Sequence, residues 1–157
     1  MNICVDTQMA CASEEVPDED SMRHWASAAL RDESASAELS LRIVDEQESA
    51  ALNQQYRGKA GATNVLSFPF DAVTPEPLPI LGDIVICAPV VNREAIEQHK
   101  PAEAHWAHMC VHGVLHLLGY DHVGDHDAEV MEALEISILQ ELGFSSPYAD
   151  ELPKATS

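Results

Sequence analysis

The sequence is short of basic residues, and this shortage excludes one class of function. Only 8 of its 157 residues are Lys or Arg, against 27 Asp and Glu, so the formal net charge at pH 7 is −19 with the histidines neutral. A surface this acidic repels nucleic-acid phosphates over a distance set by salt screening. The chain is therefore no general nucleic-acid coat protein, and we expect no DNA partner. Any phosphate contact must be concentrated in a local basic patch.

Cysteines are also few and widely spaced. The four are Cys4, Cys11, Cys87 and Cys110, and no C-x-x-C pair occurs. This pattern excludes a disulfide framework and a thiolate metal site. We expect reduced thiols that are buried as small apolar residues.

Long apolar runs are missing as well. No stretch approaches the roughly 20 residues that a membrane helix requires. Residues 1–12 lack the basic start and apolar run of a secretory signal, and acidic residues follow from Glu14. The sequence therefore predicts a cytoplasmic protein with no membrane partner.

The length fits one domain, which we place at residues 1–144, with 145–157 as a disordered tail that lacks periodicity. Alternating and helical spacings of apolar residues predict four strands, at 3–7, 39–45, 65–70 and 80–87, and five helices, at 17–31, 46–55, 90–99, 101–118 and 127–142. Pro69 places its strand near a sheet edge, because proline cannot donate to the ladder. The prolines at 75, 77 and 79 indicate a loop. On the last helix, Glu129, Glu132 and Glu135 are expected to face solvent. Such elements favour an α/β or α+β layer around one mixed sheet.

The main chemical signal is a histidine motif at residues 112–122. His112 and His116 are four residues apart in a helical stretch, so both side chains leave the same face. Gly119 is expected to end that helix, and a turn would bring His122 to the same metal ion. The spacing H-x-x-x-H-x-x-G-x-x-H matches the long zinc motif of metzincin proteases. Three histidines with an open fourth position predict a hydrolytic zinc centre.

Gly113 separates this motif from the proteases. They carry a glutamate after the first histidine, and it serves as general base. Its absence disfavours a peptidase. Zinc alone can lower the pKa of bound water to about 7, so a hydrolytic site still fits.

Other polar residues surround the motif. We expect His105, His108 and His126 to be exposed, or hydrogen-bonded behind the metal ligands, rather than bound to the ion. Asp121 is expected either to accept an imidazole N–H or to face water.

A basic loop at residues 56–64 is the second unusual feature. Arg57 and Lys59 stand there beside Gly58 and Gly61, which let backbone N–H groups approach an anion. Arg57 can grip a phosphate with two hydrogen bonds. An ordinary exposed loop is an equally good interpretation of this segment alone.

Three strings together, at residues 56–70, 81–87 and 112–122, resemble the YbeY family of bacterial ribosomal-RNA maturation factors. The likeness covers about 39–143. It implies an α+β fold with a central mixed four-stranded sheet packed by about five helices. It also implies a single-strand-specific, metal-dependent endoribonuclease that processes the 3′ end of small-subunit ribosomal RNA, in ribosome maturation and quality control.

The same resemblance implies site residues and partners. One zinc per chain would be bound by His112, His116 and His122, and Arg57 matches the family's functional arginine. Asn64 stands where aspartate is frequent. Expected partners are small-subunit ribosomal RNA, the small subunit and its assembly proteins.

We expect zinc to polarise a phosphodiester oxygen or to supply hydroxide, while Arg57 stabilises the transition state and Lys59 helps to bind the strand. The main rival is a non-catalytic ribosome-assembly factor with a structural zinc, since the basic loop is small and the chain acidic. A metallopeptidase is the weaker alternative.

Overall fold

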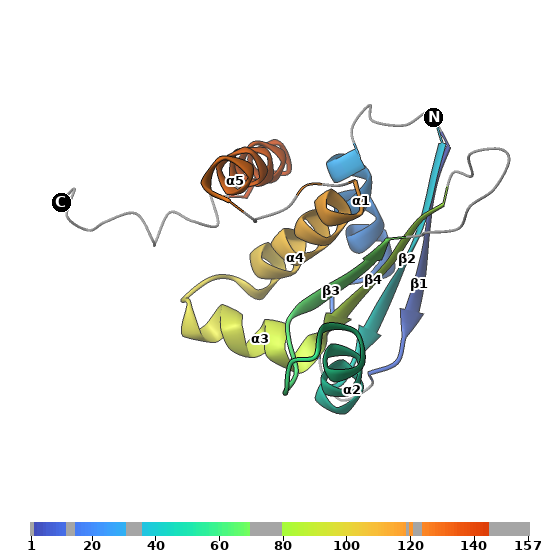
Figure 1. Cartoon of the computed structure of the whole chain (residues 1–157). Coiled ribbons are helices and arrows are strands. Elements are labelled where there is room, and N and C mark those ends of the chain that lie inside the picture. Colours follow the sequence, from blue (N-terminus) through green and yellow to red (C-terminus); the bar gives the residue numbers. More distant parts are fainter. Residues whose placement is uncertain are drawn as a thin grey trace, which may run out of the picture.

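The computed structural model describes residues 2–11, 15–30, 36–69, 80–118, 120 and 124–144. Within them the elements are β1 (Asn2–Met9), α1 (Glu19–Leu30), β2 (Ser36–Val44), α2 (Glu46–Arg57), β3 (Val65–Pro69), β4 (Ile80–Cys87), α3 (Ala88–Glu97), α4 (Ala102–Leu117) and α5 (Asp125–Glu141). Figure 1 shows the helices packed around one sheet, so the predicted α+β fold is confirmed. The predicted proline loop, the tail 145–157, and Gly119, Asp121 and His122 lie outside the described residues.

The sheet is mixed, with strand order β1-β2-β4-β3. The pairs β1/β2 and β2/β4 are parallel, whereas β3 runs antiparallel to β4. Strand β3 therefore lies at an edge, as Pro69 predicted, and Pro69 pairs with Gly82 of β4. Parallel neighbours need long crossovers, which here contain helices.

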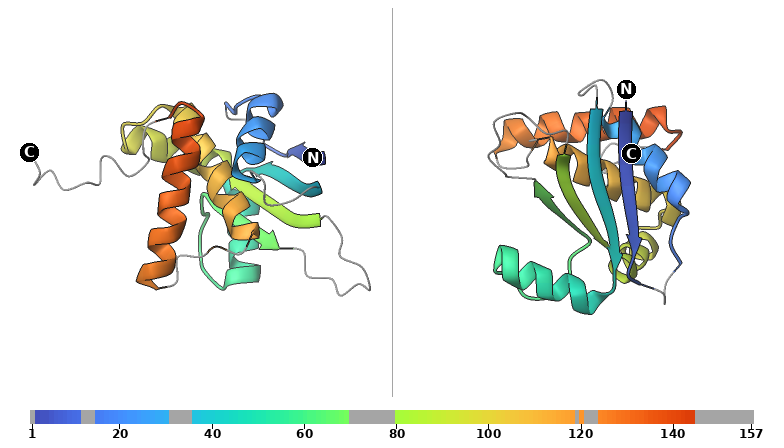
Figure 2. Two further views of the ribbon diagram at one scale, coloured as in Figure 1. Left: turned by 90° about the horizontal axis from the view of Figure 1, so that it is seen from above. Right: turned by 90° about the vertical axis from the view of Figure 1, so that its right-hand side faces the viewer.

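The two faces of the sheet contact different helices. On the first face, Leu41 and Ile43 of β2 and Ile84 of β4 pack against α1, α4 and α5 in the main core. On the other face, Val44 and Val85 form a smaller cluster next to α2. Figure 2 shows α1, α4 and α5 on one side of the sheet and α2 on the other. The alternation along β2 follows from the period of two of an extended chain.

The described residues also test two of the predictions from composition. Cys11, Cys87 and Cys110 are buried thiols that form no disulfide, as expected. Among the described helices, none is both long enough and apolar enough to cross a membrane.

Candidate metal centre and basic loop

Four histidines form a stripe along helix α4, at positions 105, 108, 112 and 116. Spacings of three and four residues place them on one face. Successive rings contact each other edge to face, with centroids 6.2, 6.1 and 4.6 Å apart. His105 and His108 are only 3% and 8% exposed. The first two histidines therefore face neighbouring helices, whereas His112 and His116 are partly exposed.

The structure brings His112 and His116 together, as their spacing predicted. The Nε2 atoms of the two rings are 3.1 Å apart. A neutral imidazole carries one N–H and one lone pair, and the lone pair is what binds a metal ion. Two Nε2 atoms that converge in this way point at a common position. The predicted third ligand, His122, lies outside the described residues.

Glu135 of helix α5 completes the buried part of this cluster. Its Oε2 lies 2.8 Å from Nδ1 of His112 and 2.9 Å from Nε2 of His108. Glu135 is 0% exposed, so the prediction that it faces solvent was wrong. Met131 and Ile138, four residues before it and three after it, are also fully buried. That spacing puts Glu135 on the apolar stripe of α5. The spacing could have predicted that Glu135 is buried, but a charged residue is ordinarily expected to be exposed.

Electrostatics keep this carboxylate ionised. Burial is the largest single effect and would raise the pKa of Glu135, but the hydrogen bonds from His108 and His112 and their charges together hold that pKa well below its usual range. Burial lowers the pKa of His108, and Glu135 offsets this only in part. A buried anion between imidazoles favours a cation nearby. His108, His112 and Glu135 offer ligand atoms within 4.8 Å of one another, so the cluster can hold a metal ion.

Gly113 lies on the opposite side of helix α4, against the sheet. A Cβ at this position would be 2.8 Å from Cγ2 of Ile84 in β4. Ser67 of β3 donates a hydrogen bond to the Gly113 carbonyl, at 3.2 Å. The helix therefore approaches the sheet too closely for the glutamate that metzincins carry after the first histidine.

A second network joins the end of the basic loop to the histidine stripe. Nε2 of His105 lies 2.8 Å from Oε1 of Glu94 in α3, and the amide of Asn64 donates to the same oxygen at 3.0 Å. His105 and His108 are thus hydrogen-bonded to carboxylates, which is one of the two predicted alternatives. His126 follows the other alternative and is exposed. Sequence reasoning missed both carboxylates.

The basic loop is fastened at the end of helix α2. Gly58 adopts a left-handed conformation, with φ of 66°, and its N–H donates to the carbonyl of Gln54 at 3.1 Å. This is the usual way for a glycine to end a helix. The buried side chain of Asn53 donates to the Gly61 carbonyl at 2.9 Å. The hydroxyl of Ser49 bonds both the N–H and the carbonyl of Thr63, each at 3.0 Å.

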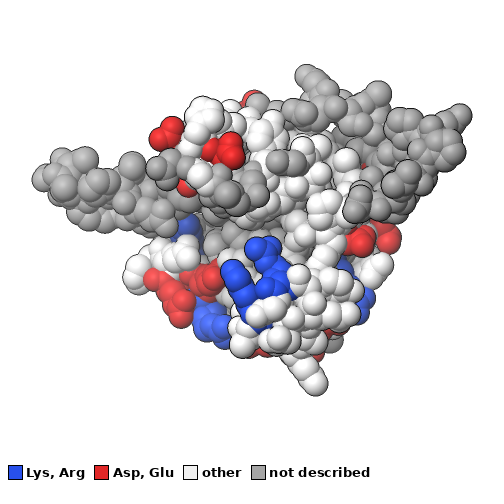
Figure 3. Space-filling model, in the orientation of Figure 1, with Lys and Arg blue, Asp and Glu red and all other residues white. Residues whose placement is uncertain are grey.

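Arg57, the last residue of α2, and Lys59, in the loop that follows, are both exposed. Figure 3 shows a small group of basic side chains over α3 and the loop that follows α2, with acidic side chains beside them. Local basic character on an acidic molecule is what the charge count predicted.

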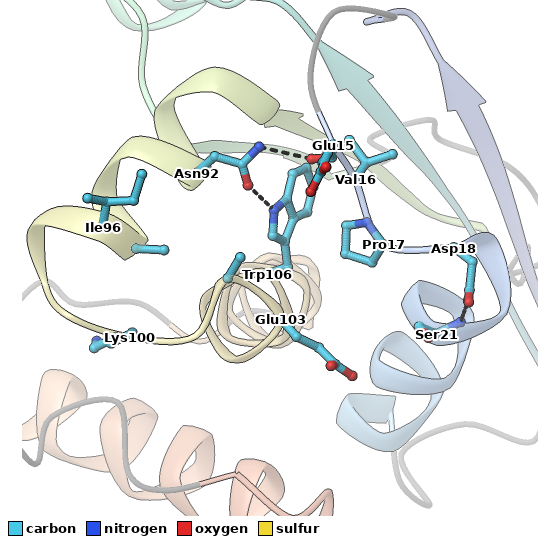
Figure 4. A pocket seen from close by; sticks show the side chains of 12 residues that line it. Glu15, Val16, Pro17, Asp18, Ser21, Asn92, Ile96, Lys100, Glu103 and Trp106 are labelled. Atoms are coloured by element: carbon cyan, nitrogen blue, oxygen red, sulfur yellow. Dashed lines mark hydrogen bonds between the residues drawn. The ribbon is translucent and has the colours of Figure 1, made fainter.

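Two grooves of about 430 Å³ each lie elsewhere. One, on the outer sheet face beside α2, contains Tyr56, whose ring meets Phe68 edge to face at 5.1 Å. The other lies between residues 15–18, α3 and α4 (Figure 4), where Trp106 donates to Asn92 at 2.8 Å. Histidines line neither groove. The histidine stripe with the basic loop is therefore the better candidate site.

Comparisons with known proteins identify the family of this chain. A family model described as Endoribonuclease YbeY matches residues 6–143. A Methylococcus capsulatus protein named Endoribonuclease YbeY is 58% identical over 150 residues, covering 94% of this chain and 97% of that protein. The solution structure of TM1509 from Thermotoga maritima has the same fold, with a TM-score of 0.57, 23% identity and 99% coverage of both chains. The family match spans most of the sequence, and the chain belongs to the YbeY family.

Proposed function

We propose that this protein is a metal-dependent endoribonuclease that cuts single-stranded RNA during 3′-end processing of small-subunit ribosomal RNA. The family model and the Methylococcus relative both bear the name endoribonuclease. The observation that carries the proposal is the convergence of the His112 and His116 Nε2 atoms, 3.1 Å apart, beside a buried carboxylate. Such an arrangement suits a Lewis-acid metal and has no evident purpose in a purely structural core.

The residues present fit one zinc ion per chain. His112 and His116 would bind it through Nε2, together with His122. Zinc favours neutral imidazole nitrogens in sites of this kind. His108, His112 and Glu135 are an alternative ligand set. We favour the first set because Nδ1 of His112 already contacts Glu135, which leaves Nε2 for the ion. When bound, zinc polarises a phosphodiester oxygen or lowers the pKa of water.

Arg57 and Lys59 would bind the RNA. The guanidinium of Arg57 can bind two phosphate oxygens at once, and it can stabilise the negative charge that develops during cleavage. Lys59 would attract a neighbouring phosphate of the RNA strand through the single charge of its ammonium group. Arg57 is fixed at the end of α2, and the hydrogen bonds of Asn53 and Ser49 hold the loop that carries Lys59.

A net charge of −19 opposes unassisted binding to the ribosome. We therefore propose that assembly proteins of the small subunit recruit the enzyme, which would act in the cytoplasm. Recruitment by a protein surface would place the small basic loop on its RNA target without a large basic face.

The test compares wild type with Arg57→Ala and His112→Ala on a single-stranded ribosomal-RNA precursor. We expect both variants to lose cleavage, but only His112→Ala to lose zinc, as measured by metal analysis. Arg23→Ala is a matched control, because Arg23 is an exposed arginine on α1. Circular dichroism checks that each variant is folded. Equal cleavage by all four proteins would refute the nuclease assignment.

The acidic surface also supports an alternative function, that of a non-catalytic assembly factor with a structural zinc. Chelation separates the two. A structural zinc contributes folding energy, so its removal would unfold the chain. For the enzyme we expect a folded metal-free protein that no longer cuts RNA and regains activity with zinc.

A further inference from the structure

We propose that Glu135 is a positioning residue for the metal centre, because it fixes His112 in the tautomer whose Nε2 carries the lone pair that binds the ion. This inference rests on the proposed function and names a residue on another helix that prepares the site. Glu135 itself would remain outside the ligand set.

The contact between Glu135 and His112 decides the tautomer. An ionised carboxylate can only accept hydrogen bonds, so the Nδ1 atom of His112, 2.8 Å away, must be the donor. A neutral imidazole with its proton on Nδ1 has its lone pair on Nε2. That atom faces Nε2 of His116 at 3.1 Å. One buried carboxylate therefore presents the correct nitrogen of His112 for metal binding.

His108 holds the carboxylate in place. Its Nε2 lies 2.9 Å from the same oxygen of Glu135, and the His108 ring is almost fully buried. Two donors on one oxygen fix the carboxylate more firmly than one would. His108 thus acts on the metal centre through Glu135. This role explains why His108 is buried although the ligand motif does not include it.

The packing of apolar residues on helix α5 fixes the position of Glu135. Met131, Ile138 and Leu139 are each at most 1% exposed, and they anchor the same face of α5 in the core. The hydrogen bond from His112 of α4 to Glu135 of α5 couples the orientation of the His112 ring to the packing of α5.

Two other roles for Glu135 make different predictions. As a structural anchor alone, it would affect folding and leave metal affinity unchanged. As a direct ligand with His108 and His112, it would bind zinc without help from His116.

The experiment measures zinc affinity by competition with a chelating dye, for wild type, Glu135→Gln and His116→Ala. Glu129→Gln is the control for loss of one α5 carboxylate, because Glu129 is exposed. We expect Glu135→Gln to weaken zinc binding about 10- to 100-fold, the usual effect of losing a partner behind a metal-bound histidine. The metal-free variant should stay folded, because its amide oxygen still accepts a bond from His112, but its melting temperature should fall because the carboxylate held by His108 and His112 is lost. Glu129→Gln should match wild type in both measurements.

The remaining outcomes refute the proposal in distinguishable ways. Wild-type zinc affinity in Glu135→Gln, with a lower melting temperature, would leave only a structural role. Undiminished binding by His116→Ala, with none by Glu135→Gln, would make Glu135 a ligand. A wild-type protein that binds no zinc would remove the proposed metal centre itself.

A second measurement needs no variant. Nitrogen-15 NMR of the metal-free wild-type protein reports which ring nitrogen of each histidine carries the proton. We expect His112 to be protonated on Nδ1 and bare on Nε2. The opposite tautomer would overturn the proposal even if Glu135→Gln failed to fold.

Discussion

The side-chain amide of Asn64 donates a hydrogen bond to the carboxylate of Glu94, with 3.0 Å between Nδ2 and Oε1. Oδ1 of the same amide accepts from the N–H of Val65, at 2.7 Å. Glu94 also bonds His105, so the start of β3 is joined through α3 to the histidine stripe of α4. The amide both donates to Glu94 and accepts from the backbone, whereas an ionised aspartate could only accept, and this gives Asn64 a role that aspartate could not fill.

Replacement of Asn64 by aspartate should therefore destabilise the protein. It removes the donor and places two carboxylates in contact, which we expect to lower the free energy of unfolding by about 1–3 kcal/mol at pH 7. Urea denaturation measures the change. The double variant Asn64→Asp with Glu94→Gln should recover part of the loss, since glutamine can donate to the new carboxylate. Failure to recover would mean that the pair does not interact as described.

Glu94 should also contribute a pH-dependent stability. Burial would raise the pKa of Glu94, but the hydrogen bonds from His105 and Asn64 and nearby positive charge together lower it below its ordinary value of 4.5. A carboxyl with a lowered pKa stabilises the fold fully above its unfolded pKa, and this contribution is lost as the pH falls through the folded pKa. The stability difference between wild type and Glu94→Gln should be constant near neutrality and shrink below about pH 4.5. A difference that grows on acidification would contradict this sign.

Gly113→Ala should destabilise the protein through the contact with Ile84. Overpacking of this kind costs about 1–3 kcal/mol, and the better helix propensity of alanine offsets up to about 1 kcal/mol. Urea denaturation in a double-mutant cycle tests the mechanism. The cost of Gly113→Ala should be smaller in an Ile84→Ala background, because the clashing side chain is gone. Equal costs in both backgrounds would show that Ile84 is not the obstacle.

Asn53→Ala should weaken RNA binding without loss of zinc. It removes the hydrogen bond that ties Gly61 to helix α2, so Lys59 loses its fixed position relative to Arg57 at the end of α2. We expect KM for RNA to rise about fivefold, equivalent to roughly 1 kcal/mol, with unchanged zinc content. Gln55→Ala is the control, since Gln55 is an exposed residue of the same helix. An equal effect from both changes would indicate general damage to α2.

Local sequence patterns predicted the elements of this fold well, because alternation and helical spacing are read within a few residues. The strand predicted at 65–70 spans Val65–Pro69 at the sheet edge, and the spacing of His112 and His116 predicted their convergence. Glu135 could not be assigned in this way. Its partners lie 23 and 27 residues earlier on another helix, and a glutamate spaced three residues from other glutamates on a helix is usually exposed. Only the packing of α5 against α4 shows that this carboxylate is inside.

The hydrogen bonds that fasten the basic loop have a thermodynamic consequence. Ordering a flexible backbone lowers its conformational entropy, by roughly 1–2 kcal/mol per residue at 25 °C. In this chain Asn53, Ser49 and Gly58 hold the loop in place before any RNA arrives. This entropy is lost when the protein folds and not when RNA binds. Most of the electrostatic attraction between the loop and a phosphate would therefore contribute to binding affinity. Under the proposed function, Arg57 and Lys59 would thus bind RNA with little loss of chain entropy, in a protein that has few other basic residues.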